Sequence, residues 1–324
     1  MPVTSITRSP EDLTLTVVAE FPVPVRRLWD AYADPRQLER FWGPPGWPAR
    51  FLRHDMAVGG RSHYAMSGPN GSWHPGYWQF TAVDAPRSFT VLDGFANEDF
   101  SPSTELPPVQ MVYTFEETEA GSRVTTVATF ASVEHLQTHL DMGMEQGLQA
   151  AMTQMDAVVM DLARFAADRL AEADIIDDTH VRVTRVIRGT PEQVWRAHNE
   201  VALLQRWMLG PDGWTMPVCE VPTEVGQPYR FEWEREGGGD RFGFTGELLA
   251  LDPHYRIVQT ERMIGVDGPG TINEMTLTPV DGGTLLSVLI TYPSKELRDM
   301  VLATGMVDGM EASYARLEAV ALGD

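Results

Sequence analysis

The segment LERFWGPPGW at residues 38–47 recurs as LQRWMLGPDGW at residues 204–214. The second copy contains one inserted residue, Leu209. An ordered recurrence of Leu, Arg, aromatic, Gly, Pro and Trp residues indicates an internal repeat, and a repeat determines the fold at the level of whole domains. The rest of the chain follows the same repeat on both sides of this segment.

The repeat covers nearly the whole sequence. Upstream, Phe21–Phe41 aligns with Ile187–Trp207. Downstream, Gly143 and the residues after it align with Gly305 and the residues after it. Each copy has about 150 residues, which is the size of one domain, so the pattern predicts two homologous domains rather than a solenoid.

The predicted domain limits follow from the ends of the two copies. We predict a first domain over residues 10–173 and a second domain over residues 177–324. The acidic stretch Asp174–Asp178 is predicted to be a short linker. Residues 164–173 are predicted to extend the last helix of the first domain and to contact the second domain, because a short charged linker without Gly or Pro holds domains close together.

The local patterns are the same in both copies. Residues 13–21 alternate between apolar and polar side chains, which is typical of a strand. Pro24 and Pro191 are each predicted to open a helix, because proline is favoured in the first helical turn. Asn70-Gly71 predicts a tight turn between antiparallel strands.

Each copy ends with apolar residues at helical spacing. This spacing predicts one long amphipathic helix from Leu140 to Leu162 and another from Leu302 to Val320. The apolar stripe of each helix is predicted to cover the open face of the preceding sheet.

The composition limits the kind of partner. The chain has 324 residues, with 46 acidic and 25 basic side chains and a net charge of −21. Nucleic acids and anionic membranes would be repelled by this charge, so neither is predicted as a partner. The single cysteine, Cys219, excludes an internal disulfide, and no apolar run suggests a leader or a membrane span. We therefore predict a cytoplasmic protein.

The whole pattern resembles a known group of proteins. A strand, two helices with a tryptophan, a Trp-Gly-Pro segment, a strand meander and a C-terminal helix resemble the SRPBCC superfamily, which includes START lipid-transfer domains and birch-pollen-allergen-like proteins. Both copies are most similar to the branch named after the heat-shock-protein-90 ATPase activator homologue. The matching residues are Trp29, Trp42-Gly43-Pro44 and Val58-Gly59-Gly60-Arg61 in copy one, and Trp195, Gly210-Pro211 and Gly305-Met306 in copy two. The resemblance implies an α+β helix-grip fold for each domain, with a curved antiparallel sheet wrapped around a long C-terminal helix.

The resemblance also implies a cavity between each sheet and its last helix. Strand alternation and helical spacing predict the side chains that face it. In the first domain they are Tyr64, Met66, Phe80, Met111, Tyr113, Met144, Leu148 and Met152. In the second domain they are Phe231, Trp233, Phe244, Leu248, Met275, Met306 and Met310. Methionine-rich walls adapt to varied apolar ligands, but the same residues would also fill a solid core, and the sequence leaves both alternatives open.

Few residues suggest chemistry. His135 and His139 share one helix face, but the second copy has Leu297 and Val301 there and no third ligand follows, so no metal site is predicted. No cofactor motif is present. Glu261 and the matching Asp93 either turn inward as catalytic groups or lie at a solvated strand end.

These observations predict a binding protein for small hydrophobic or aromatic molecules, without catalytic residues. Two alternatives remain open: an enzyme similar to polyketide aromatase/cyclases, and a chaperone-ATPase-regulating protein with an unidentified protein partner. The sequence leaves open whether the protein is an enzyme.

Overall fold

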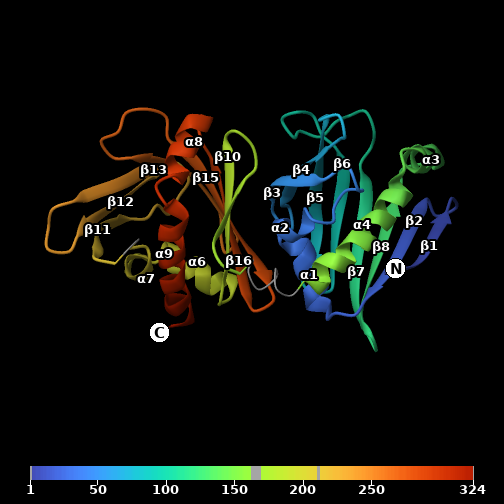
Figure 1. Cartoon of the computed structure of the whole chain (residues 1–324), viewed down its shortest axis with the longest axis horizontal. Helices are drawn as coiled ribbons and strands as arrows, with labels where there is room; N and C mark the ends of the chain where they lie inside the picture. Colours follow the sequence, from blue (N-terminus) through green and yellow to red (C-terminus); the bar gives the residue numbers. More distant parts are fainter. Residues whose placement is uncertain (1, 162–168, 210–211, 324) are drawn as a thin grey trace. The chain divides into compact units, whose positions relative to one another are not determined.

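The computed structural model describes residues 2–161, 169–209 and 212–323. The chain divides into two compact units, Met1–Arg164 (domain one) and Phe165–Asp324 (domain two). Each domain has an eight-stranded antiparallel sheet with helices against one face (Figure 1). The predicted α+β class with two tandem helix-grip domains is therefore confirmed.

The sheet of domain one is a meander closed by the N-terminal hairpin. Its strands are β1 (Val3–Ser9), β2 (Thr14–Phe21), β3 (Ala49–His54), β4 (Arg61–Ser67), β5 (Trp73–Asp84), β6 (Ser88–Phe95), β7 (Val109–Thr118) and β8 (Gly121–Thr129). Their order across the sheet is β1-β2-β8-β7-β6-β5-β4-β3. The helices are α1 (Val25–Ala33), α2 (Pro35–Leu38), α3 (Val133–Asp141) and α4 (Met144–Met160).

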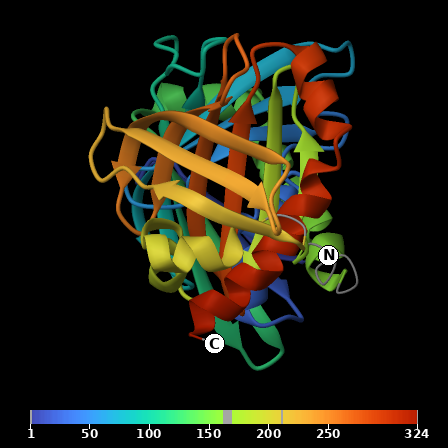
Figure 2. The ribbon, with the colours of Figure 1, turned by 90° about the vertical axis from the view of Figure 1, so that its left-hand side faces the viewer.

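Domain two repeats this topology. Its strands are β9 (Glu172–Ile175), β10 (His180–Ile187), β11 (Trp214–Glu220), β12 (Pro228–Arg235), β13 (Arg241–Asp252), β14 (Arg256–Met263), β15 (Thr271–Val280) and β16 (Gly283–Thr291). Their order is β11-β12-β13-β14-β15-β16-β10-β9. The helices are α6 (Pro191–Asn199), α7 (Val201–Trp207), α8 (Lys295–Leu302) and α9 (Met306–Leu322). In Figure 2 the C-terminal helix α9, in red, lies against the short yellow helices α6 and α7.

The helix starts follow the predicted proline signals. Pro24 is the N-cap of α1, and Pro191 lies in the first turn of α6. Thr190 and Gln193 form a capping box that satisfies backbone N–H groups at the start of α6.

The prediction of one uninterrupted helix at the end of each copy is wrong at its start. Leu140 lies in α3 and Leu302 lies in α8, and a glycine separates each of these helices from the next one. Gly143 has φ of +87° and Gly305 has φ of +78°, a left-handed conformation that favours glycine and ends a helix. The apolar periodicity continues across the break, which is why the sequence pattern conceals it.

Two edge strands were not predicted. Strand β1 begins at Val3, ahead of the expected start at residue 10. Strand β9 occupies Glu172–Ile175, where a helix end and a linker were expected, and it pairs with β10. These residues therefore belong to the sheet of domain two rather than to an extension of α4, which ends at Met160. Residues 162–168 of the predicted extension lie outside the described residues, and the predicted contact between the domains stays a prediction.

Candidate ligand-binding site

The predicted lining residues of domain one lie in a densely packed interior. Tyr64, Phe80, Met111, Tyr113, Leu148 and Met152 are buried, and Met66 and Met144 are half-buried. Aromatic rings fill the space between them: Phe89 stacks on Tyr113 with ring centroids 4.4 Å apart, and Trp78 lies edge-on to Phe80 at 6.2 Å. Such ring pairs leave little uncovered surface.

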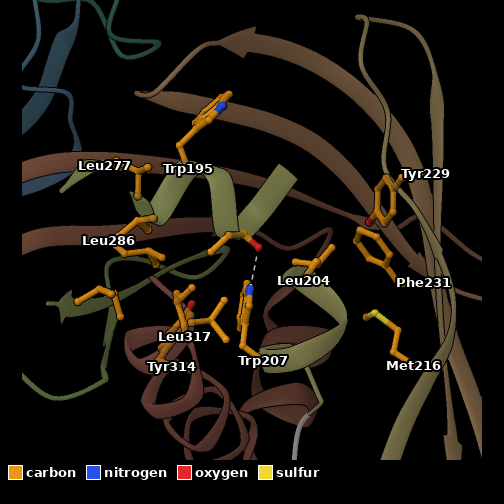
Figure 3. Packing of buried hydrophobic residues seen from close by; sticks show 14 of the residues in the cluster. Trp195, Leu204, Trp207, Met216, Tyr229, Phe231, Leu277, Leu286, Tyr314 and Leu317 are labelled. Atoms are coloured by element: carbon orange, nitrogen blue, oxygen red, sulfur yellow. Dashed lines mark hydrogen bonds between the residues drawn. The ribbon is translucent and has the colours of Figure 1, made fainter. Parts of the chain in front are cut away.

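The predicted lining residues of domain two are less completely covered. Phe231, Trp233 and Leu248 are buried, whereas Phe244, Met275 and Met310 are half-buried against the same apolar cluster. Met306 packs against a second cluster at the other end of α9. Figure 3 shows Leu277 and Leu286 near Trp195, and Tyr229 with Phe231 beyond Leu204.

The strand registers make the two interiors directly comparable. Phe51 pairs with Tyr64 in domain one as Cys219 pairs with Phe231 in domain two. The same reasoning along β6 to β8 and β14 to β16 gives five further inward positions. The matched residues are Phe89 and Ile257, Val91 and Gln259, Met111 and Asn273, Tyr113 and Met275, and Thr126 and Val288.

These six inward positions differ systematically between the domains. All six residues of domain one are at most 1% exposed, and all six of domain two are half-buried. Phe51, Phe89 and Tyr113 are replaced by the smaller Cys219, Ile257 and Met275. Domain two therefore carries less side-chain volume on the same sheet frame and leaves inward surface accessible.

At a seventh position the large ring lies on different strands in the two domains. Trp78 on β5 lies opposite Ser62 on β4, whereas in domain two Gly246 on β13 lies opposite Tyr229 on β12. A Cβ atom on Gly246 would lie 2.8 Å from the Tyr229 ring and 1.8 Å from the carbonyl oxygen of Thr260. Glycine is therefore required there, and the tyrosine ring occupies the space above it.

Each domain places a tyrosine next to an inward carboxyl group. The hydroxyl of Tyr64 donates to Asp93 at 2.9 Å. Burial raises the pKa of Asp93 to about 7, while Tyr64 and the nearby indole of Trp78 partly oppose this shift. The indole N–H of Trp78 favours the ionised form of Asp93 from nearby, but it does not form a hydrogen bond of normal geometry. The side chain of Asp93 is half-buried.

In domain two the carboxyl group belongs to a larger polar group. The hydroxyl of Tyr229 donates to Glu261 at 3.3 Å. Burial raises the pKa of Glu261, and the neighbouring side chains of Asn273 and Tyr229 oppose the shift. Burial, assisted by the charge of Glu261, raises the pKa of Tyr292 to about 12. Both Glu261 and Asn273 are half-buried, and the strand register places Asn273 opposite Gln259 on the inward face.

A histidine marks another part of the domain-two interior. His198 on α6 has its ring centroid 4.7 Å from that of Trp207, and its Nδ1 bonds to the carbonyl of Val194 at 2.8 Å. Burial lowers the pKa of His198 to about 4, so the ring is neutral at pH 7. The side chain is half-buried.

An ion triad fixes α9 to the sheet. The guanidinium of Arg185 on β10 donates two 3.1 Å hydrogen bonds to Glu311 and one of 2.8 Å to Glu318. The same carboxylates accept the backbone N–H groups of Ala171 and Arg188. The matching residue of domain one is Ala19, so domain two alone has this triad.

Sequence reasoning found only part of this site. It placed Asp93 and Glu261 on the correct strands but did not assign their tyrosine partners, and it did not single out His198 or Asn273. The size differences between Phe89 and Ile257 and between Tyr113 and Met275 were visible in the sequence. Among the described residues no group of three or more His, Cys, Asp or Glu is arranged to hold a metal ion, and no helix is long and apolar enough to cross a bilayer.

The fold and the interior define a class: two tandem helix-grip domains of the SRPBCC superfamily. The family described as "Activator of Hsp90 ATPase homolog 1-like protein" matches residues 22–160 and 188–321. These segments make up most of the sequence, and the chain belongs to this family.

Similar solved structures each correspond to about half of this chain. A crystal structure from Mycobacterium smegmatis is 52% identical over 49% of this chain and 98% of that chain, with a TM-score of 0.47. A solution structure from Arthrobacter aurescens is 44% identical over 48% and 91%, with a TM-score of 0.47. A crystal structure from Rhodobacter sphaeroides is 30% identical over 48% and 99%, with a TM-score of 0.44. No curated protein matches the chain.

Proposed function

We propose that the protein is a cytoplasmic binding protein and that domain two holds a small hydrophobic or aromatic molecule between its sheet and α9. The observation that carries this proposal is the difference at the six matched inward positions, which are half-buried in domain two and at most 1% exposed in domain one. Domain one serves as an internal reference, because the same topology with larger side chains has a filled interior. In this proposal domain one binds no ligand and has a structural role.

Restoring the domain-one side chains in domain two tests the proposal without a known ligand. The double variant Ile257→Phe/Met275→Tyr is expected to fold and to melt at or above the wild-type temperature, because the added atoms enter free space. In a filled core the same enlargement would cost about 1–3 kcal/mol through strain. Differential scanning calorimetry with hydrogen exchange, which assigns the transition to domain two, measures the effect.

The same variant tests binding. A neutral aromatic probe, 2-methylnaphthalene, is expected to bind the wild-type protein and to bind the variant at least about tenfold more weakly, since the new rings occupy its place. The matched control is Val58→Phe/Met160→Tyr, which adds the same residue types at positions of domain one that are 66% and 53% exposed. Fluorescence anisotropy of the probe gives both affinities. A destabilised domain two together with absent probe binding would refute the proposal.

The aromatase/cyclase alternative has one supporting observation. Glu261 and His198 are ionisable groups that lie in the domain-two interior, as such an enzyme requires for proton transfer. The family description provides the only support for chaperone regulation. An ATPase assay with the chaperone separates that alternative, because a small-molecule binding protein leaves the turnover unchanged at saturating concentration.

A further inference from the structure

The polar group around Glu261 indicates the chemistry of the ligand, and this inference rests on the proposed binding function of domain two. We infer that the ligand carries an amine, whose N–H groups donate to the carboxylate of Glu261 while its apolar part lies against Ile257 and Met275. The amine would lie beside Tyr229, which hydrogen-bonds to Glu261, and near Asn273 on the neighbouring strand.

The first argument concerns hydrogen-bond capacity. A carboxylate has about four acceptor positions. The hydroxyl of Tyr229 occupies one of these positions on Glu261. Among the described residues no cationic side chain contributes to the pKa shift of Glu261. Glu261 therefore keeps acceptor capacity and has no described cationic partner, which is the arrangement that an ammonium group complements.

The second argument concerns the cost of burial. The ionised form of Glu261 is disfavoured by its surroundings. A ligand cation at hydrogen-bond distance offsets this cost, because the pair of charges attract each other in a region of low polarity. A purely apolar ligand leaves the cost unchanged, and an anionic ligand increases it.

The third argument comes from domain one. Gln259 and Asn273 replace the buried Val91 and Met111 of domain one, so these two amide side chains have no counterpart at the matching positions of domain one. Buried polar side chains generally have hydrogen-bond partners, so polar groups at these inward positions favour a ligand that carries a polar group. The net charge of −21 further favours the approach of a cation.

Three matched probes test the inference on the full chain. They share one ring system and differ in one substituent: 2-naphthylmethylamine, 2-methylnaphthalene and 2-naphthoic acid. At pH 7.5 and about 0.15 M salt, where long-range charge effects are screened, the amine is expected to bind at least about tenfold more tightly than the methyl compound, and the acid more weakly than either. Isothermal titration calorimetry provides the affinities.

Two variants locate the source of the preference. Glu261→Gln keeps the shape of the side chain and is expected to abolish the advantage of the amine while the affinity for 2-methylnaphthalene stays the same. Asp93→Asn makes the matching change in domain one and is expected to leave the advantage intact. Circular dichroism confirms that both variants fold.

The outcomes separate this inference from the proposed function. Equal binding of the amine and the methyl compound, or an amine preference that survives Glu261→Gln, overturns the inference and leaves the binding function standing. Absence of binding for all three probes overturns both. Tighter binding of the acid overturns the amine assignment alone.

Discussion

Replacing Arg185 with alanine is expected to lower the free energy of unfolding of domain two by about 3 kcal/mol. The guanidinium is 7% exposed and bonds Glu311 and Glu318, which are 34% and 13% exposed. Its removal takes the counter-charge from Glu311 and leaves Glu318 with only the exposed Arg188, and such poorly compensated, partly buried charge costs more than the loss of a surface pair. This loss of unfolding free energy is larger than that caused by most single substitutions.

The control for this prediction is Arg188→Ala. Arg188 also pairs with Glu318, at 3.4 Å, but its side chain is 66% exposed, so its loss is expected to cost under about 1 kcal/mol. Hydrogen exchange of the Ala171 and Arg188 amides supplies a local measurement, because both amides donate to the triad carboxylates. Equal melting temperatures of domain two in the two variants would show that the triad does not hold α9 in place.

Replacing Asp93 with asparagine is expected to stabilise domain one at pH 8 by about 2–4 kcal/mol and to remove a pH dependence. The pKa of Asp93 is about 7 in the folded protein, compared with an ordinary value of 3.8. Between these values the folded form binds a proton that the unfolded form lacks, so the stability falls as the pH rises from about 4 to about 7. Asparagine stays neutral and still accepts the hydrogen bond from Tyr64.

Chemical denaturation at pH 5 and pH 8, followed by hydrogen exchange in domain one, measures this effect. Asp84→Asn is the matched control, because Asp84 lies on the adjacent strand β5 with its side chain 60% exposed. Its substitution is expected to change the stability by less than about 0.5 kcal/mol. A wild-type domain one whose stability rises between pH 5 and pH 7 would contradict the assignment of the raised pKa.

The sequence predicted the elements whose signals are local. Prolines marked the starts of α1 and α6, and alternation marked the strands that line the interior. The edge strands β1 and β9 escaped prediction because an edge strand buries neither face fully and therefore shows no clear alternation. The contact pattern of β9 depends on its pairing with β10, which is a tertiary interaction.

The polar part of the site required the structure. The sequence left open whether Glu261 turns inward or lies at a solvated strand end. Its partner Tyr229 aligns in sequence with Ser62, whereas the corresponding partner in domain one is Tyr64. Alignment of the two copies therefore separates residues that have the same role. The triad of Arg185 was equally hidden, because Arg185 and Glu311 lie far apart in the chain and domain one has Ala19 at the matching strand position.

The position of the Tyr229 ring opposite Gly246 restricts which substitutions domain two can accept. The pair Ser62 and Trp78 can be converted into the arrangement of Tyr229 and Gly246 only by changing both residues. A tyrosine in place of Ser62 alone would collide with Trp78, and a glycine in place of Trp78 alone would leave a void. In domain two the carbonyl oxygen of Thr260 lies only 1.8 Å from the position that a Cβ atom on residue 246 would occupy. No single substitution of Gly246 then gives the packing of domain one, because strand β14 would first have to move. Exchange of one interior for the other by design therefore requires simultaneous changes at residues 229 and 246 together with space for a Cβ atom beside β14.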